Sequence, residues 1–343
     1  MKISANWIRS ELPWLEAVSE EEIQRRMDSL GHRLTISPEI WEFTTCAQHG
    51  GLYGVNGILR EISAAFGKVY HIPQPQVQDE DIGSVYELLD ADVWSDTLCN
   101  RFTVKMGVNL NSGKTPDWMK ERILSAGFPC TDCVQDVATY VSLEYGQPIH
   151  LLDAQAISDG AITLRESYGY ETIEDMPLPH GFPVLESGEE ILAIPSYWTA
   201  PHCTVSGSTT SAVISAIHYP EEIIALCAEV FGLVPKRPYF PDPLLTITAV
   251  ERVCQLIQEL GYGQIPDGTI DILNFVPNPQ KIDLQALDLG GISLNQDELN
   301  TLLNVIGITP DGIIPSWRPD LDCPEAVAGE IARIHRVNNQ TKD

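Results

Sequence analysis

Basic residues are scarce in this chain of 343 residues. Lysine and arginine total 21 against 48 aspartates and glutamates, a formal net charge of −27 at pH 7. Binding to nucleic acid needs a cationic face, because neutralisation of phosphates supplies most of the affinity. The densest basic clusters are pairs rather than stripes: Arg25 with Arg26, Lys236 with Arg237, and Arg333 with Arg336. The composition therefore disfavours autonomous binding of nucleic acid, although acidity also serves solubility alone.

Long hydrophobic runs are absent as well. No stretch approaches the roughly 18 apolar residues that a membrane-spanning helix needs. The segment from Met1 to Trp7 has no apolar core of signal-peptide length, so we expect a cytoplasmic protein with no membrane partner. Hydrophobic residues make up 43% of the chain, which is ordinary for a globular protein.

Several motifs that carry chemistry are also missing. The sequence has no G-x-x-x-x-G-K-[ST], no G-x-G-x-x-G after a strand and no H-E-x-x-H. Its eight cysteines are scattered and are expected to be reduced. Cys130 and Cys133 have the spacing of half a zinc site, but no second pair stands at matching spacing. A redox role for this pair would require a helix start inside a βαβ unit.

The positions of proline and glycine divide the sequence into three units of an α+β protein. We predict a small helical unit at 1–75, a mixed α/β unit at 85–235, and a small winged-helix-like α+β unit at 243–337. Proline-rich linkers are predicted at 72–81 and 234–243. Capping patterns and periodicity predict helices at 19–30, 52–66, 116–126, 137–143, 220–231 and 244–260, one opened by Asn295 with Glu298, and one from Pro324.

Two stretches of sequence point to a particular protein family more specifically than these helix and linker signals do. Residues 137–153 read VATYVSLEYGQPIHLLD, and residues 315–320 read PSWRPD, followed by EIARI at 330–334. The chain resembles bacterial phenylalanyl-tRNA synthetase β subunits, in which D-x-T-N-Y-V precedes E-x-G-Q-P-x-H-x-x-D and P-S-W-R-P-D precedes E-E-V-A-R-I-Y. Residues 1–9, 57–62 (GILREI) and 116–119 (PDWM) agree with the family in the same order.

The resemblance also shows what this sequence lacks. The family's oligonucleotide-fold insert, which resembles an aminoacyl-tRNA-binding domain, should fall near residue 40, and only a short stretch stands there. The catalytic-core-like and anticodon-binding modules have no counterpart, and the adenylate-forming signature is absent. The chain therefore resembles a truncated and degenerate paralogue.

The family edits mischarged tRNA by hydrolysing an ester, which requires a positioned water and donors for the developing oxyanion. The resemblance implies that His150 and Asp153 persist from this site, while Ala138 and Thr139 replace the family's Thr-Asn pair. Residues 196–203 stand where the family has a Gly-Gly-Glu run and lack both the glycines and the glutamate. If editing survives, His150, Thr139 and Asp153 carry it. Otherwise Ala138, Thr139 and His150 hold an amino acid, or 147–150 form a buried turn.

Four carboxylates in the family's last module resemble magnesium ligands. Here Asp320 and Glu330 remain, whereas Ala326 and Gly329 stand at the other two positions. Magnesium often keeps several waters, so two carboxylates hold it weakly, with Asp322 or Glu325 as substitutes. The alternative is two ordinary surface acids. No cofactor is required, and magnesium is the one candidate.

Three hypotheses follow. The first is a non-catalytic accessory or regulatory subunit that binds an aromatic amino acid, an α-like catalytic chain, or both. The second is a freestanding deacylase of mischarged tRNA, which the absence of a basic surface disfavours. The third is a shortened β subunit that needs its α partner for phenylalanine–tRNA ligase activity.

Overall fold

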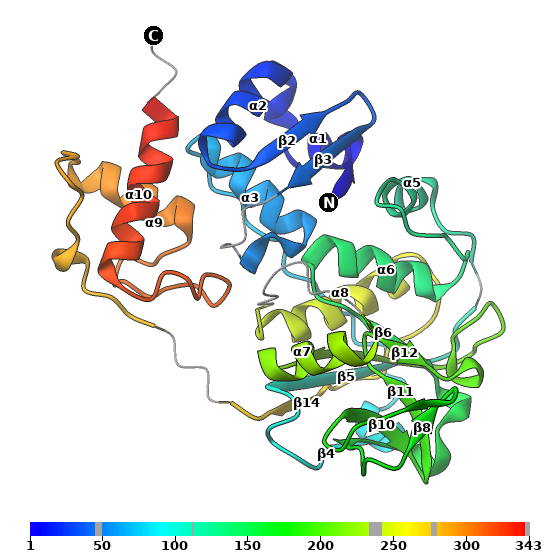
Figure 1. Cartoon of the computed structure of the whole chain (residues 1–343). Coiled ribbons are helices and arrows are strands. Elements are labelled where there is room, and N and C mark those ends of the chain that lie inside the picture. The colour runs from blue at the N-terminus through cyan, green and yellow to red at the C-terminus, as the bar shows by residue number, and fades with distance from the viewer. Residues whose placement is uncertain (45–49, 112, 233–241, 276–279, 340–343) are drawn as a thin grey trace. The chain divides into compact units, whose positions relative to one another are not determined.

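The computed structural model describes all residues except 45–49, 112, 233–241, 276–279 and 340–343 (Figure 1). It divides into two compact units. The first unit comprises 1–73, 124–128 and 277–343, and the second comprises 74–123 and 129–276. In the described part of the chain, no helix is both long and apolar enough to cross a membrane.

The N-terminal part of the first unit combines helices with a small sheet. Its elements are β1 (Lys2–Ser4), α1 (Ala5–Glu11), η1 (Pro13–Ala17), α2 (Glu20–Ser29), β2 (Arg33–Ile36), β3 (Ile40–Thr44), η2 (Gly50–Tyr53) and α3 (Val55–Ala65). The strands pair antiparallel in the order β1-β3-β2. The small helical unit predicted at 1–75 therefore also contains a sheet, which was not predicted because strands of three to five residues are too short to show clear alternation in sequence.

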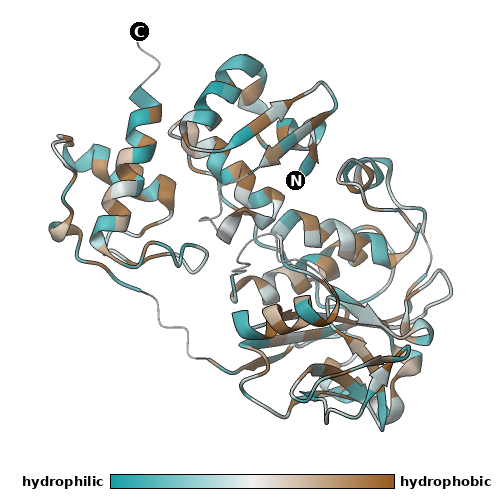
Figure 2. Ribbon diagram, viewed as in Figure 1, coloured by the Kyte–Doolittle hydropathy of each residue, from teal (hydrophilic) through white to brown (hydrophobic). Residues whose placement is uncertain are grey.

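Helix α2 forms where the capping pattern predicts it. The Ser19 Oγ accepts a hydrogen bond from the Glu22 backbone N–H at 3.2 Å, and Gly31 follows the helix with a φ of 86°. The helix is largely hydrophilic along its length (Figure 2) and buries Ile23, Arg26 and Met27. Tertiary packing of this narrow face therefore stabilises α2.

The C-terminal part of the first unit contains η6 (Leu284–Ala286), α9 (Gln296–Ile306) and α10 (Pro324–Asn339). Helix α9 begins with a complete capping box between Asn295 and Glu298, as predicted. From 280 to 339, all of them described, the structure has no strand, and one isolated bridge joins Lys281 to Ile313. Residues 243–275 lie in the second unit, so the domain predicted at 243–337 does not correspond to one unit.

The second unit contains two main sheets. The four-stranded sheet has the order β14-β5-β13-β6, and the five-stranded sheet has the order β12-β11-β10-β7-β4. The strands are β4 (Asp90–Val93), β5 (Arg101–Gly107), β6 (His150–Asp153), β7 (Ala161–Glu166), β8 (Thr172–Ile173), β9 (Met176–Pro177), β10 (Pro183–Ser187), β11 (Glu190–Ile194), β12 (Trp198–Thr199), β13 (Ala212–His218) and β14 (Ile270–Leu273). A shared core takes residues from both sheets, among them Phe102, Val104, Leu164, Leu185 and Val213.

Helices α6 (Val134–Tyr145) and α8 (Leu245–Glu259) cover the other face of the four-stranded sheet. The remaining helices are α4 (Val85–Leu88), α5 (Asp117–Ser125) and α7 (Glu221–Val230), with short η3 (Ala154–Ala156), η4 (Ser158–Gly160) and η5 (Pro201–Cys203). Helix α8 contacts β5 and β13, and α6 packs beside α8 (Figure 1). Thr103 on β5 donates to the Thr246 hydroxyl on α8 at 3.0 Å, so this face of β5 is turned toward α8.

Two segments predicted as linkers have different outcomes. Most of 234–243 lies outside the described residues. Residues 74–81 belong to the second unit and pack against α8. The Gln258 side chain on α8 hydrogen-bonds both the N–H and the C=O of Gln78, at 2.8 and 2.9 Å. The Glu80 carboxylate accepts the Ile265 N–H at 2.7 Å. The prolines restrict the backbone of this segment, but the segment is not a free linker, because its polar groups hydrogen-bond to the rest of the second unit.

Candidate functional site

The segment before α6 is organised by one buried carboxylate, that of Asp136, which is 1% exposed. It accepts hydrogen bonds from the Thr115 and Thr131 hydroxyls, from the backbone N–H groups of Thr131 and Asp132, and from the Cys130 thiol. Burial raises the pKa of Asp136, but these hydrogen bonds outweigh it and leave the pKa lowered. Asp136 is therefore a structural anchor for the start of α6.

This arrangement accounts for the cysteine pair. Cys133 is the N-cap residue of α6, while burial and the neighbouring Asp136 raise the pKa of Cys130. Ligand atoms of Cys130, Asp132 and Asp136 lie within 4.8 Å of one another. Both carboxylate oxygens of Asp136 already accept from the protein, so a cation would have to displace these donors. The geometry therefore favours structure over metal binding or redox chemistry.

The motif that follows α6 forms a buried, hydrogen-bonded turn. Gly146 ends the helix with a φ of 73°, a conformation that glycine adopts without a steric penalty. Gln147 is fully buried and donates through Nε2 to the Ile217 carbonyl at 3.1 Å. The Ile149 N–H donates to the Ser142 hydroxyl at 3.0 Å. Much of the family-like signature therefore serves the connection from α6 to β6.

His150 begins β6, the edge strand that pairs with β13. It lies opposite Ser215 and shares a face with Leu152, which is turned toward the core between the two sheets. The residue is 9% exposed, and its Nε2 has no hydrogen-bond partner. Burial lowers the pKa of His150 to about 4. The imidazole is therefore neutral at pH 7, and among the described residues no carboxylate hydrogen-bonds it to orient it as a general base.

The other predicted site residues are engaged elsewhere. The Thr139 hydroxyl donates to the Gln135 carbonyl at 2.9 Å within α6, and Ala138 is fully buried. The Asp153 carboxylate accepts from the Gln155 N–H at 3.0 Å and from the Thr209 hydroxyl at 2.6 Å. In the described part of the chain, no hydrogen bond or ion pair joins any two of Ala138, Thr139, His150 and Asp153.

The segment at 196–203, which lacks the family's glycines and glutamate, contains a stacked aromatic ring and a buried cysteine. Tyr197 stacks on Phe231 with ring centroids 5.4 Å apart. His202 is exposed and lies 3.3 Å from the Glu190 carboxylate, whereas Cys203 is fully buried and burial raises its pKa to about 11. Both residues belong to η5, and in the described part of the chain no hydrogen bond or ion pair joins them.

Asp320 and Glu330 do meet, but through an arginine. The Arg318 guanidinium donates to both oxygens of Asp320, at 2.8 and 2.7 Å, and to Glu330 at 2.7 Å. Glu330 is 6% exposed and also binds Arg333. Burial raises the pKa of Glu330, but the Arg333 hydrogen bond and the two arginine charges leave it lowered. A magnesium ion would face these guanidinium groups, so the residues do not fit the ion.

The same cluster connects segments that are distant in sequence. Arg333 donates to the Glu61 carboxylate at 3.1 Å and to the Leu30 carbonyl at 2.9 Å. The Arg60 guanidinium lies 3.6 Å from the centre of the Trp317 ring. Two segments that carry the family resemblance, 57–62 and 315–334, are therefore in contact.

Comparisons with known proteins agree with this geometry. Residues 98–262, from the segment before β5 to just past α8, match the B3/4 domain family, and all of them except 124–128 lie in the second unit.

The wider similarity covers most of the chain. It is 25% identical to the phenylalanine–tRNA ligase beta subunit of Clostridium tetani over 89% of its length, and 25% identical to that of Geobacter metallireducens over 91%. It is 26% identical to that of Rhodopirellula baltica over 87%. The predicted resemblance to this β subunit is confirmed. The chain spans about two fifths of these relatives, 41%, 41% and 46% of their lengths.

Burial of neutral His150 makes a prediction about pH. Its pKa is about 4 in the folded chain and near 6.5 in the unfolded chain, so below pH 6.5 the unfolded state binds a proton that the folded state does not. The part of the free energy of unfolding that depends on neutral His150 is retained above pH 6.5 and lost as the pH falls toward 4. Between pH 7 and 5, we expect the native chain to lose about 2 kcal/mol relative to His150→Gln. Urea unfolding at each pH measures this difference.

The matched control is the exposed His180 of the same unit. His180→Gln should follow the native chain within error across the pH range. A native chain and a His150→Gln variant with parallel pH profiles would contradict the burial of a neutral imidazole.

Proposed function

We propose that this chain is a non-catalytic accessory subunit, built on the scaffold of phenylalanine–tRNA ligase beta subunits, that acts by pairing with an α-like catalytic chain. One observation carries the proposal: in the described part of the chain, no hydrogen bond or ion pair joins the residues at the editing-type positions to one another. The Asp153 carboxylate is committed to Gln155 and Thr209, and the Thr139 hydroxyl to its own helix.

The remaining chemistry also favours binding over hydrolysis. A neutral His150 whose Nε2 has no partner is poorly placed to activate water, since a general base is normally oriented by a second group. The stretch 196–203 offers no glutamate and no adjacent glycines for an oxyanion. A net charge of −27 disfavours capture of tRNA without a partner. The relatives are beta subunits, which supports an α-type chain as that partner.

The test has two parts. The chain is co-expressed with a phenylalanine–tRNA ligase α-type chain from the same genome, and the mixture is resolved by size-exclusion chromatography. We expect a stable complex with a Kd below about 1 μM, roughly −8 kcal/mol. In parallel, phenylalanine tRNA mischarged with tyrosine is incubated with the chain, and we expect no deacylation above the rate without protein.

Each part is able to overturn the proposal. Separate elution of the two chains at micromolar concentration would contradict the pairing. Turnover of mischarged tRNA that His150→Ala abolishes, and that Asp96→Asn on the exposed surface leaves intact, would establish a deacylase instead.

A further inference from the structure

A line of polar side chains runs beneath α8 on strand β5. Phe102, Val104 and Met106 face the core between the sheets, so the alternate residues Arg101, Thr103 and Lys105 face α8. The polar groups of the first two have partners: Arg101 forms a bidentate ion pair with Asp271 on β14, and Thr103 hydrogen-bonds to Thr246 and Asp271. Lys105, the last of the line, has no carboxylate within ion-pair distance in the described part of the chain.

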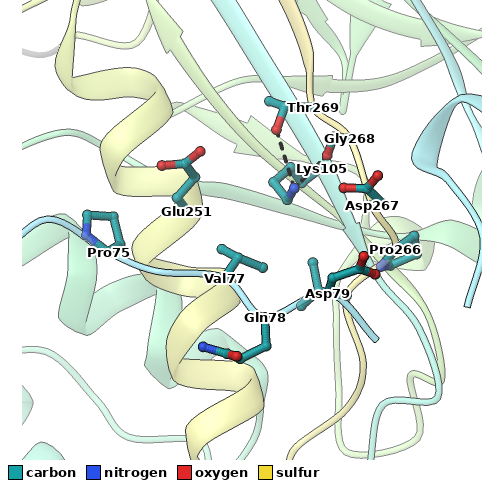
Figure 3. A pocket seen from close by; sticks show the side chains of 11 residues that line it. Pro75, Val77, Gln78, Asp79, Lys105, Glu251, Pro266, Asp267, Gly268 and Thr269 are labelled. Carbon is teal, nitrogen blue, oxygen red and sulfur yellow. Dashed lines mark hydrogen bonds between the residues drawn. The ribbon is translucent and has the colours of Figure 1, made fainter. Parts of the chain in front are cut away.

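Lys105 instead lines a cavity of about 270 Å³ (Figure 3). The segment 75–79, helix α8 and the loop 265–269 form its other walls. The volume lies close to the lower end of ligand pockets, about 300 Å³, so an occupant would be small. None of Ala138, Thr139, His150 and Asp153 lines this cavity.

The Lys105 ammonium group is held in place but retains hydrogen-bonding capacity. The residue is 5% exposed, and its Nζ donates to the Gly268 carbonyl and to the Thr269 hydroxyl, the latter at 3.3 Å. An ammonium group has three N–H donors, so one is left for an acceptor in the cavity. A buried lysine positioned by two neutral oxygens is a fixed positive charge that lacks a counter-ion.

Glu251 supplies the opposite charge from α8 (Figure 3). It is half-buried, and in the described part of the chain its carboxylate makes no hydrogen bond or ion pair. Burial raises its pKa, and the charges of Lys105 and Arg101 offset this in part. The cavity wall therefore combines a positioned ammonium and a free carboxylate that are not paired with each other. The exposed Asp79 and Asp267 add negative charge at the rim.

We propose that this cavity binds the zwitterionic head of a free α-amino acid, with the ligand carboxylate on Lys105 and the ligand ammonium on Glu251. A simple anion would meet three carboxylates, and a simple cation would meet the fixed charge of Lys105. A molecule that carries both groups satisfies the unused donor and the unused acceptor together. The ligand side chain would then lie along Pro75, Val77 and Pro266.

Calorimetric titration of the full chain with each of the twenty amino acids tests the proposal. For the amino acid that binds most tightly, the decarboxylated amine and the corresponding 2-hydroxy acid are titrated in the same way. We expect both analogues to bind at least tenfold more weakly than the amino acid. Glu251→Gln, which preserves shape, and Lys105→Met should each weaken binding at least tenfold.

His150→Ala is the matched control, and it should leave the affinity within about twofold. Thermal melting of each variant verifies that it is folded, and Glu251→Gln carries the test if Lys105→Met is unstable. Absence of binding by all twenty amino acids would overturn the proposal. So would binding that only His150→Ala removes, or an amine that binds as tightly as its parent amino acid. None of these outcomes depends on the pairing with an α-type chain.

Discussion

Replacing Glu330 with alanine is expected to lower the stability of the first unit by about 3–5 kcal/mol. Glu330 is 6% exposed, and its carboxylate binds Arg318, which is also buried, and Arg333, which is partly buried. Removing it leaves these charges without their shared partner in a place that water hardly reaches, which costs more than the pair itself contributes. The loss should extend to α3, because Arg333 also binds Glu61.

Hydrogen exchange read by mass spectrometry separates this effect from the second unit. Amides of α3 and α10 should lose protection, while those of α6 and β13 should not change. Glu330→Gln keeps the shape and removes the charge, and we expect it to fall between the alanine variant and the native chain. The control is Glu325→Gln on the exposed face of α10, which should cost less than about 0.5 kcal/mol. Equal behaviour of positions 325 and 330 would contradict the buried network.

Replacing Asp136 with alanine is expected to cost the second unit about 3–5 kcal/mol. Thr115 is fully buried, so its hydroxyl would lose its acceptor without gaining water. The backbone N–H groups of Thr131 and Asp132 would lose theirs as well. Several unmade hydrogen bonds at about 1–3 kcal/mol each exceed the cost of an ordinary surface substitution.

Urea unfolding monitored at amides of α6 and α8 measures the loss. Asp136→Asn tests the charge separately, because an amide keeps one oxygen acceptor and brings N–H groups toward existing donors. Asp96→Asn, an exposed position of the same unit, is the control for the change in net charge. An Asp136→Ala variant as stable as the control would show that the loop before α6 is held by other contacts.

The sequence determined much of the local structure. Ser19, Asn295 and the glycines after helices are local signals, because a cap is satisfied within three or four residues of itself. Helices α2, α8, α9 and α10 accordingly appear where these signals and the apolar spacing place them. The resemblance to the β subunit could also be predicted from the sequence, because 137–153 and 315–334 carry specific residue types in a fixed order.

The roles of those residues were decided by tertiary structure. Asp320 and Glu330 looked like cation ligands in sequence, but Arg318 binds both carboxylates. In sequence, Lys105 is one residue of the stretch RFTVKM at 101–106, and only the packing of α8 made it a buried charge against a cavity. A sequence states which charges a chain carries, but a charge acquires its function from what lies within a few ångströms of it. Those neighbours come from segments that only the folded chain brings together.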